Sequence, residues 1–161
     1  MKRIICIGNR YVPEDAAGSQ VYERLLQNTL PSDVQVIDGG LAGLNLLPFI
    51  EGAERVVFVD SVSGFGQYDE SRPGRSDRNE IVVLKAADVT AMAESRYGHS
   101  AGLAYLLRVL PDVCDGIVPH ILLVGIEGQS NKDTIDQAAA LALKIVIGGQ
   151  AFLGVQNENQ G

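Results

Sequence analysis

The chain has 161 residues, of which 46% are hydrophobic and 20% charged, the composition of an ordinary soluble globular protein. This length is enough for one domain with a substantial core and too short for two ordinary ones. The formal net charge of −7 disfavours nucleic acid as a partner, because binding to phosphates needs a basic surface.

Apolar runs that predict strands alternate along the chain with segments of helical periodicity. In chain order, we expect a strand at 3–7, a helix at 15–29, a strand at 34–37, a short helix at 41–50, strands at 55–59 and 81–84, a helix at 100–110 that ends at Pro111, a strand at 121–125 and a helix at 133–147. The strands are continuous runs of Val, Ile and Leu, which is typical of strands buried on both faces.

These elements predict a single α/β domain over residues 1–155 and a polar tail over 156–161. The domain is expected to be a three-layer sandwich, with about five strands in a twisted, mostly parallel sheet flanked by helices. A long polar segment, 61–80, follows the third strand, and loops of this length in a compact domain are often functional. No signal-peptide pattern and no long apolar run occurs, so we expect no membrane contact and a cytoplasmic protein.

Carboxylates follow three of the predicted strands. Asp15 lies in the loop after the first strand, Asp38 follows the second and Asp60 follows the third, while His99 precedes the helix at 100–110. Because ligands gather at the carboxyl ends of parallel strands, these residues are expected to converge at one edge of the sheet. Two acids and an imidazole are a ligand set for a borderline divalent metal with an open position.

Taken singly, most of these residues have a simpler structural explanation. Asp15 would cap the helix that follows it, Asp38 would bond its own backbone in a turn, and His99 would be a hydrogen-bonded residue near a helix start. Asp60 is harder to explain in this way, because a carboxylate at the end of an apolar strand is costly unless it is paired or lies in a cleft. His120, at the start of the last strand, has a structural explanation.

Other chemistries have little support in the sequence. Gly8 and Gly18 lie ten residues apart in a segment without the Lys-Ser/Thr of a nucleotide loop, and its acidic residues would repel a phosphate. No Gly-x-Ser-x-Gly sequence predicts a serine nucleophile. Cys6 lies within a strand and Cys114 in a loop, which indicates reduced, packed thiols.

Five segments occur in a distinctive order: Ile-Gly-Asn at 7–9 with Glu-Asp at 14–15 and Gly18, Val-Ile-Asp-Gly-Gly at 36–40, Phe-Val-Asp-Ser-Val at 58–62, Gly-His-Ser-Ala-Gly-Leu at 98–103, and Leu-Leu-Val-Gly-Ile at 122–126. Together they resemble the motifs of the hydrogenase maturation proteases, the endopeptidases that trim the large subunit of nickel–iron hydrogenases. The resemblance runs through most of the chain and implies a phosphorylase/hydrolase-like five-stranded fold.

The resemblance implies that Asp15, Asp60 and His99 are metal ligands. It also implies a partner, the [NiFe]-hydrogenase large-subunit precursor, whose C-terminal extension is removed after nickel insertion. The nickel is then carried by the precursor, and another divalent metal such as Cd or Zn is expected to occupy the site in vitro. Asp38 is the candidate substrate contact, and no side chain stands out as a separate general base. We expect a monomer, because no apolar surface stripe is evident.

Two departures from the family pattern leave alternatives open. The acidic pair is Glu-Asp, so Glu14 competes with Asp15 as ligand, and the segment 61–80 is longer than is usual, which suits a different precursor. Two other functions also stay open. One is a non-catalytic nickel-sensing chaperone that recognises the same precursor with the same three ligands. The other is a flavodoxin-like domain that binds a small molecule and does not need His99.

Overall fold

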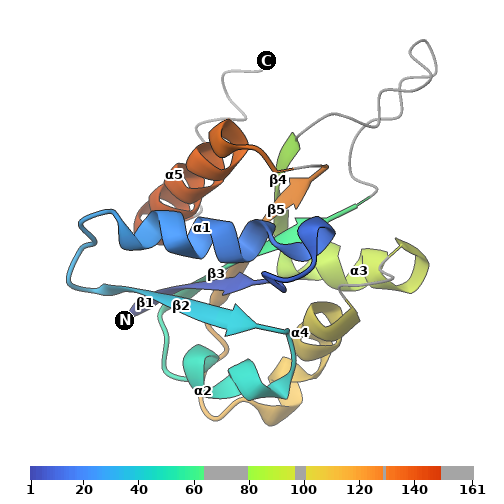
Figure 1. Ribbon diagram of the computed structural model, residues 1–161. Coiled ribbons are helices and arrows are strands. Elements are labelled where there is room, and N and C mark those ends of the chain that lie inside the picture. Colours follow the sequence, from blue (N-terminus) through green and yellow to red (C-terminus); the bar gives the residue numbers. More distant parts are fainter. Residues whose placement is uncertain (64–79, 97–100, 129, 150–161) are drawn as a thin grey trace, which may run out of the picture.

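The computed structural model describes residues 1–63, 80–96, 101–128 and 130–149 (Figure 1). Five strands form one sheet in the order β2-β1-β3-β5-β4. Four of them are mutually parallel, and β4 runs antiparallel to β5 at one side of the sheet. The strands are β1 (Lys2–Ile7), β2 (Val34–Gly40), β3 (Arg55–Val62), β4 (Glu80–Lys85) and β5 (His120–Glu127).

Helices cover both faces of this sheet, so the predicted three-layer α/β sandwich with a mostly parallel sheet is confirmed. One face carries α1 (Ala17–Leu26) and α5 (Lys132–Gly148). The other carries α2 (Leu47–Ile50), α3 (Ala86–Arg96) and α4 (Ala101–Val113). Two short 3₁₀ helices, η1 (Pro13–Asp15) and η2 (Leu44–Leu46), lie between these elements. No helix in the described part of the chain is both long and apolar enough to cross a bilayer.

The side chains of each strand alternate between two apolar clusters, one on each face of the sheet. In β1, Ile4 and Cys6 pack toward α1 and α5, whereas Ile5 and Ile7 pack toward α2 and α4. The same alternation in β3 sends Phe58 and its even-numbered neighbours to the second cluster. It therefore decides on which face each polar residue near a strand end lies.

Several element boundaries differ from those predicted. The helix predicted at 41–50 is reduced to η2 and one turn of α2, because Gly43 is fully extended and breaks the helical path. The helix predicted to end at Pro111 continues to Val113, since the proline lies in its last turn and removes only one backbone hydrogen bond. The helix α3 was not predicted, and the tail at 156–161 lies outside the described residues.

The environment of Cys6 leads to a testable expectation. Burial raises the pKa of this thiol far above its usual range, and the charge of nearby Asp38 raises it further. The neutral thiol is thus favoured in the fold, and its contribution to stability is present below the unfolded thiol's pKa of about 8.5 and falls as pH rises above it. With iodoacetamide at pH 8, mass spectrometry should show alkylation of partly exposed Cys114 well before Cys6. Equal rates for the two thiols in the folded protein would contradict this.

Candidate metal centre at the carboxyl edge of the sheet

The carboxyl ends of β1, β2, β3 and β5 meet at one edge of the sheet, here called the carboxyl edge (Figure 1). The strand β4 runs the other way, so it begins at this edge, where Glu80 lies opposite Glu127 in the backbone register of β4 and β5. Three of the predicted site residues, Asp15, Asp38 and Asp60, come from the three strand ends expected to converge here. The convergence follows from parallel pairing, as predicted.

Asp15 ends η1, in the connection between β1 and α1. Its carboxylate Oδ2 accepts a hydrogen bond from the Asn9 amide (3.2 Å), and its carbonyl oxygen accepts from the same amide (2.9 Å). The predicted capping role is wrong: Ala16 occupies the N-cap of α1 and no side chain caps that helix. The reason is that η1 turns the chain before α1 begins and holds Asp15 against the loop after β1. The residue is half-buried, and η1 packs against β3.

Glu14, the alternative ligand, is exposed, whereas its neighbour Asp15 is half-buried. This difference favours Asp15 as the residue that faces the carboxyl edge. It also fits the simple view of Glu14 as a solvated acid.

Asp60 lies inside β3, opposite Gly125 of β5. The residue is 3% exposed, which makes it the one buried acidic or basic residue among those whose side chains are described, a set that leaves out 80 and 92–96. Its Oδ1 accepts a hydrogen bond from the Ser61 amide (2.8 Å). Burial of a carboxylate is costly and is retained where it serves a purpose, which strengthens the functional interpretation of this residue.

His99 lies outside the described residues, so the three-ligand set stays a prediction. The helix that follows it in sequence, α4, starts at the carboxyl edge. A Cβ atom at Gly102 would overlap the carbonyl oxygen of Ala42, in the loop after β2, so only glycine allows this approach. Within the described ranges, which exclude His99, no three His, Cys, Asp or Glu side chains lie close enough to hold a metal ion.

Asp38 lies on the opposite face of the sheet from Asp60. It is the partner of Cys6 in the β1–β2 register, and Cys6 faces α1 and α5. Its Oδ1 accepts from the Gly40 amide (3.2 Å), the local bond expected of a turn aspartate, although Asp38 belongs to β2. Its Oδ2 pairs with the Arg10 guanidinium (2.8 Å). Asp38 and Asp60 therefore do not meet on one face of the sheet, and the substrate contact of Asp38 stays a prediction.

Arg10 is a residue that sequence reasoning did not single out. It lies in the loop after β1 and is about half exposed. No motif marks such an arginine, because its partner stands 28 residues away in the sequence. His120, by contrast, starts β5 at the opposite edge of the sheet, as expected of a structural residue.

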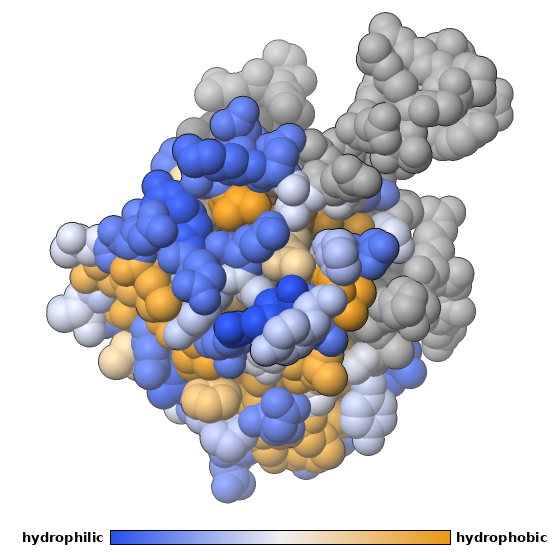
Figure 2. Space-filling view, in the orientation of Figure 1, coloured by the Kyte–Doolittle hydropathy of each residue, from blue (hydrophilic) through white to orange (hydrophobic). Residues whose placement is uncertain are grey.

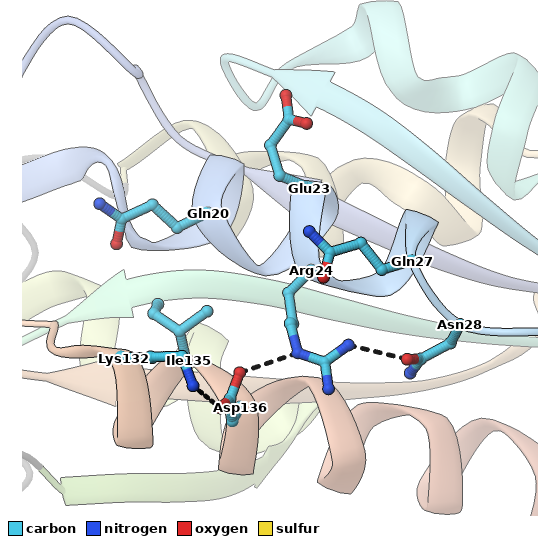
Figure 3. Close-up of a pocket in the computed structure, with 8 residues that line it drawn as sticks. All are labelled: Gln20, Glu23, Arg24, Gln27, Asn28, Lys132, Ile135 and Asp136. Carbon is cyan, nitrogen blue, oxygen red and sulfur yellow. Dashed lines mark hydrogen bonds and ion pairs between the residues drawn. The ribbon is translucent and has the colours of Figure 1, made fainter.

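A separate groove of about 660 Å³ runs between α1 and α5 (Figure 3). Arg24 donates to Asp136 (2.8 Å) and to Asn28 (2.8 Å), and Lys132 pairs with Asp136 (3.4 Å). The hydrogen bond from Arg24 lowers the pKa of the Asp136 carboxyl below its usual value. The surface over these two helices is largely hydrophilic (Figure 2). We interpret these hydrogen bonds and ion pairs as structural contacts that hold α1 against α5.

The fold is that of an α/β protein whose candidate site lies at the ends of its parallel strands. The family model "Hydrogenase maturation protease" matches residues 19–147, which include Asp38, Asp60 and His99. The chain belongs to the hydrogenase maturation protease family.

Two curated proteins show similarity over parts of the chain. The chain is 38% identical over 60 residues to the hydrogenase expression/formation protein HupD of Rhodobacter capsulatus, an alignment that covers 37% of this chain and 29% of the relative. It is 27% identical over 109 residues to the hydrogenase 2 maturation protease of Escherichia coli K12, which covers 66% of this chain and 61% of the relative. The chain thus aligns with less than two thirds of the length of either relative.

Solved structures match almost the whole chain. The hydrogenase maturating endopeptidase HybD from Escherichia coli is similar with a TM-score of 0.65 and 25% identity, over 96% of this chain and 94% of the other. The maturation protease HycI from Thermococcus kodakarensis shares the fold with a TM-score of 0.62 and 22% identity, over 90% and 89%. The family model confirms the predicted family, and these structures confirm the predicted fold.

Proposed function

We propose that this protein is an endopeptidase that removes the C-terminal extension of a nickel-loaded [NiFe]-hydrogenase large-subunit precursor. Family membership supports peptide hydrolysis in hydrogenase maturation. The observation that carries the proposal is Asp60, a buried carboxylate at the carboxyl end of a central strand, beside the segment that presents Asp15. The family assignment favours this protease over a non-catalytic chaperone and over a flavodoxin-like binding domain.

The chemistry of the residues suits a metal that arrives with the substrate. Asp15, Asp60 and His99 would contact the nickel of the precursor and place it near the scissile peptide, where a metal polarises a carbonyl or lowers the pKa of a bound water. Three ligands without a thiolate give modest affinity, so the free protein need not keep nickel. Cadmium or zinc would occupy the same ligands in vitro. Asp38, held by Arg10, would contact the substrate.

The proposal includes the setting in which the protein works. We infer a cytoplasmic monomer whose macromolecular partner is the large-subunit precursor. The acidic net charge and the acidic carboxyl edge disfavour nucleic acid.

The direct test is to mix the purified protein with a large-subunit precursor, prepared with and without nickel, and to follow the mass of the precursor. We expect the extension to be lost from the nickel-loaded precursor and retained by the nickel-free one. The precursor alone, incubated for the same time, is the control. Binding of the loaded precursor without any cleavage would contradict the protease and support the chaperone.

A further inference from the structure

Two loops at the carboxyl edge expose large apolar side chains. Tyr11 is 87% and Val12 39% exposed in the loop after β1, and Leu41 is 67% and Leu44 48% exposed in the segment after β2. We call these four residues the loop patch. A single exposed apolar residue is unremarkable, but a group of them on neighbouring loops is typical of a surface that contacts another protein.

A backbone hydrogen bond and an ion pair link the two loops that carry the patch. The Gly8 amide donates to the carbonyl of Gly40 (2.9 Å), and Arg10 pairs with Asp38 (2.8 Å). Tyr11 directly follows Arg10, and Leu41 directly follows Gly40, so each of the two residues is the sequence neighbour of a residue that links the loops. The patch is therefore held in place before any partner arrives, which lowers the entropic cost of binding.

The loop after β1 is also bonded within itself. The side chain of Asn9 accepts from the Tyr11 amide (3.0 Å) and its carbonyl accepts from the Val12 amide (3.1 Å). Tyr11 and the half-exposed Arg10 beside it belong to the residue types that dominate the energy of protein interfaces, and Val12, Leu41 and Leu44 add exposed apolar area around them.

The patch adjoins both segments that carry predicted ligands. The loop of Tyr11 continues into η1, which ends at Asp15. Ala42, next to Leu41, touches the first turn of α4, the helix that follows His99 in sequence. A protein seated on the patch would thus lie beside the candidate site.

We infer that the loop patch docks an apolar surface of the folded body of the precursor and so presents the cleavage segment to Asp15 and Asp60. This inference rests on the proposed function. A second copy of this chain on the same patch would cover the carboxyl edge, whereas a substrate must bring its own segment there. The position of the loop patch beside Asp15 therefore suits a substrate whose body rests on the patch while its cleavage segment enters the candidate site.

The test compares a patch variant with a matched control in cleavage of the nickel-loaded precursor. The patch variant is Tyr11→Ser combined with Leu41→Ser. The control is Ile117→Ser, which removes a 91% exposed aliphatic side chain before β5, at the opposite edge of the sheet. Since all three side chains are exposed, the melting temperatures should stay close to that of the wild type. We expect KM to rise at least about tenfold in the patch variant with kcat retained, and neither to change in the control.

Each other outcome overturns the inference. A patch variant with the KM of the wild type would remove the docking role and leave the proposed function intact. An equal rise of KM in Ile117→Ser would show that docking is not located at this edge. Self-association of the wild type that is lost in the patch variant, in analytical ultracentrifugation, would assign the patch to a second copy. Wild-type protein that cleaves no loaded precursor would refute the proposed function, and the docking role with it.

Discussion

Asp60→Asn is expected to abolish trimming of the nickel-loaded precursor in a protein that still folds. Asparagine has nearly the same shape as aspartate and keeps an oxygen that can accept from the Ser61 amide, but it lacks the charge that attracts a metal. Loss of the proposed metal ligand should reduce the rate more than the 10- to 100-fold typical of residues that only support a ligand, so we expect a loss of at least about 100-fold. Cleavage is measured by mass, and folding by circular dichroism.

The neighbouring acids supply a matched comparison for the same experiment. Asp15→Asn should lose activity as Asp60→Asn does, whereas Glu14→Gln, at the exposed residue beside it, should change the rate less than about twofold. Cd²⁺ binding by the free protein should weaken in Asp15→Asn, Asp60→Asn and His99→Ala but not in Glu14→Gln. Trimming that survives Asp60→Asn or His99→Ala would contradict the three-ligand assignment, and loss in Glu14→Gln alone would move the ligand to Glu14.

The strands were predictable because burial on both faces leaves uninterrupted Val, Ile and Leu runs. The ends of these strands were not, because they depend on pairing with neighbours. The strand β3 continues past Asp60 to Val62 since β5 pairs with it as far as Glu127. Helix α3 has no sustained apolar stripe, and Val89 is its one fully buried residue among those whose side chains are described. It folds through tertiary contacts that periodicity does not record.

In the candidate site too, the local sequence predicts some features, and contacts between distant residues decide the others. Asp15, Asp38 and Asp60 could be placed at one edge because parallel strands share a direction. Their individual interactions could not be predicted, because they depend on folding of the loop after β1. Asp15 accepts from the Asn9 amide instead of capping a helix, and Asp38 pairs with Arg10. Alternation of side chains separates Asp38 from Asp60 once the register of β1 and β2 is known. A sequence that specifies the acids does not by itself specify the faces on which they lie.

Gly18→Ala is expected to have the largest effect on stability. A Cβ atom at this position would overlap the carbonyl oxygen of Ile7, the last residue of β1, and that contact is with backbone that cannot rotate away. The first turn of α1 crosses the end of β1 so closely that only a residue without a side chain fits. We expect the free energy of unfolding to fall by about 3 kcal/mol or more, measured by urea denaturation.

Gly43→Ala is the control, because Gly43 is extended and a Cβ there would meet only the movable end of the Asn45 side chain, at 3.0 Å. Its effect should stay within about 0.5 kcal/mol. The short spacing between Asp15 and Gly18 then has a physical reason. Helix α1 begins directly after the segment that carries Asp15, and its first turn crosses the end of β1, the strand that precedes this segment. If Gly18→Ala were as stable as the wild type, α1 could move away from β1, and this contact would not set the position of Asp15.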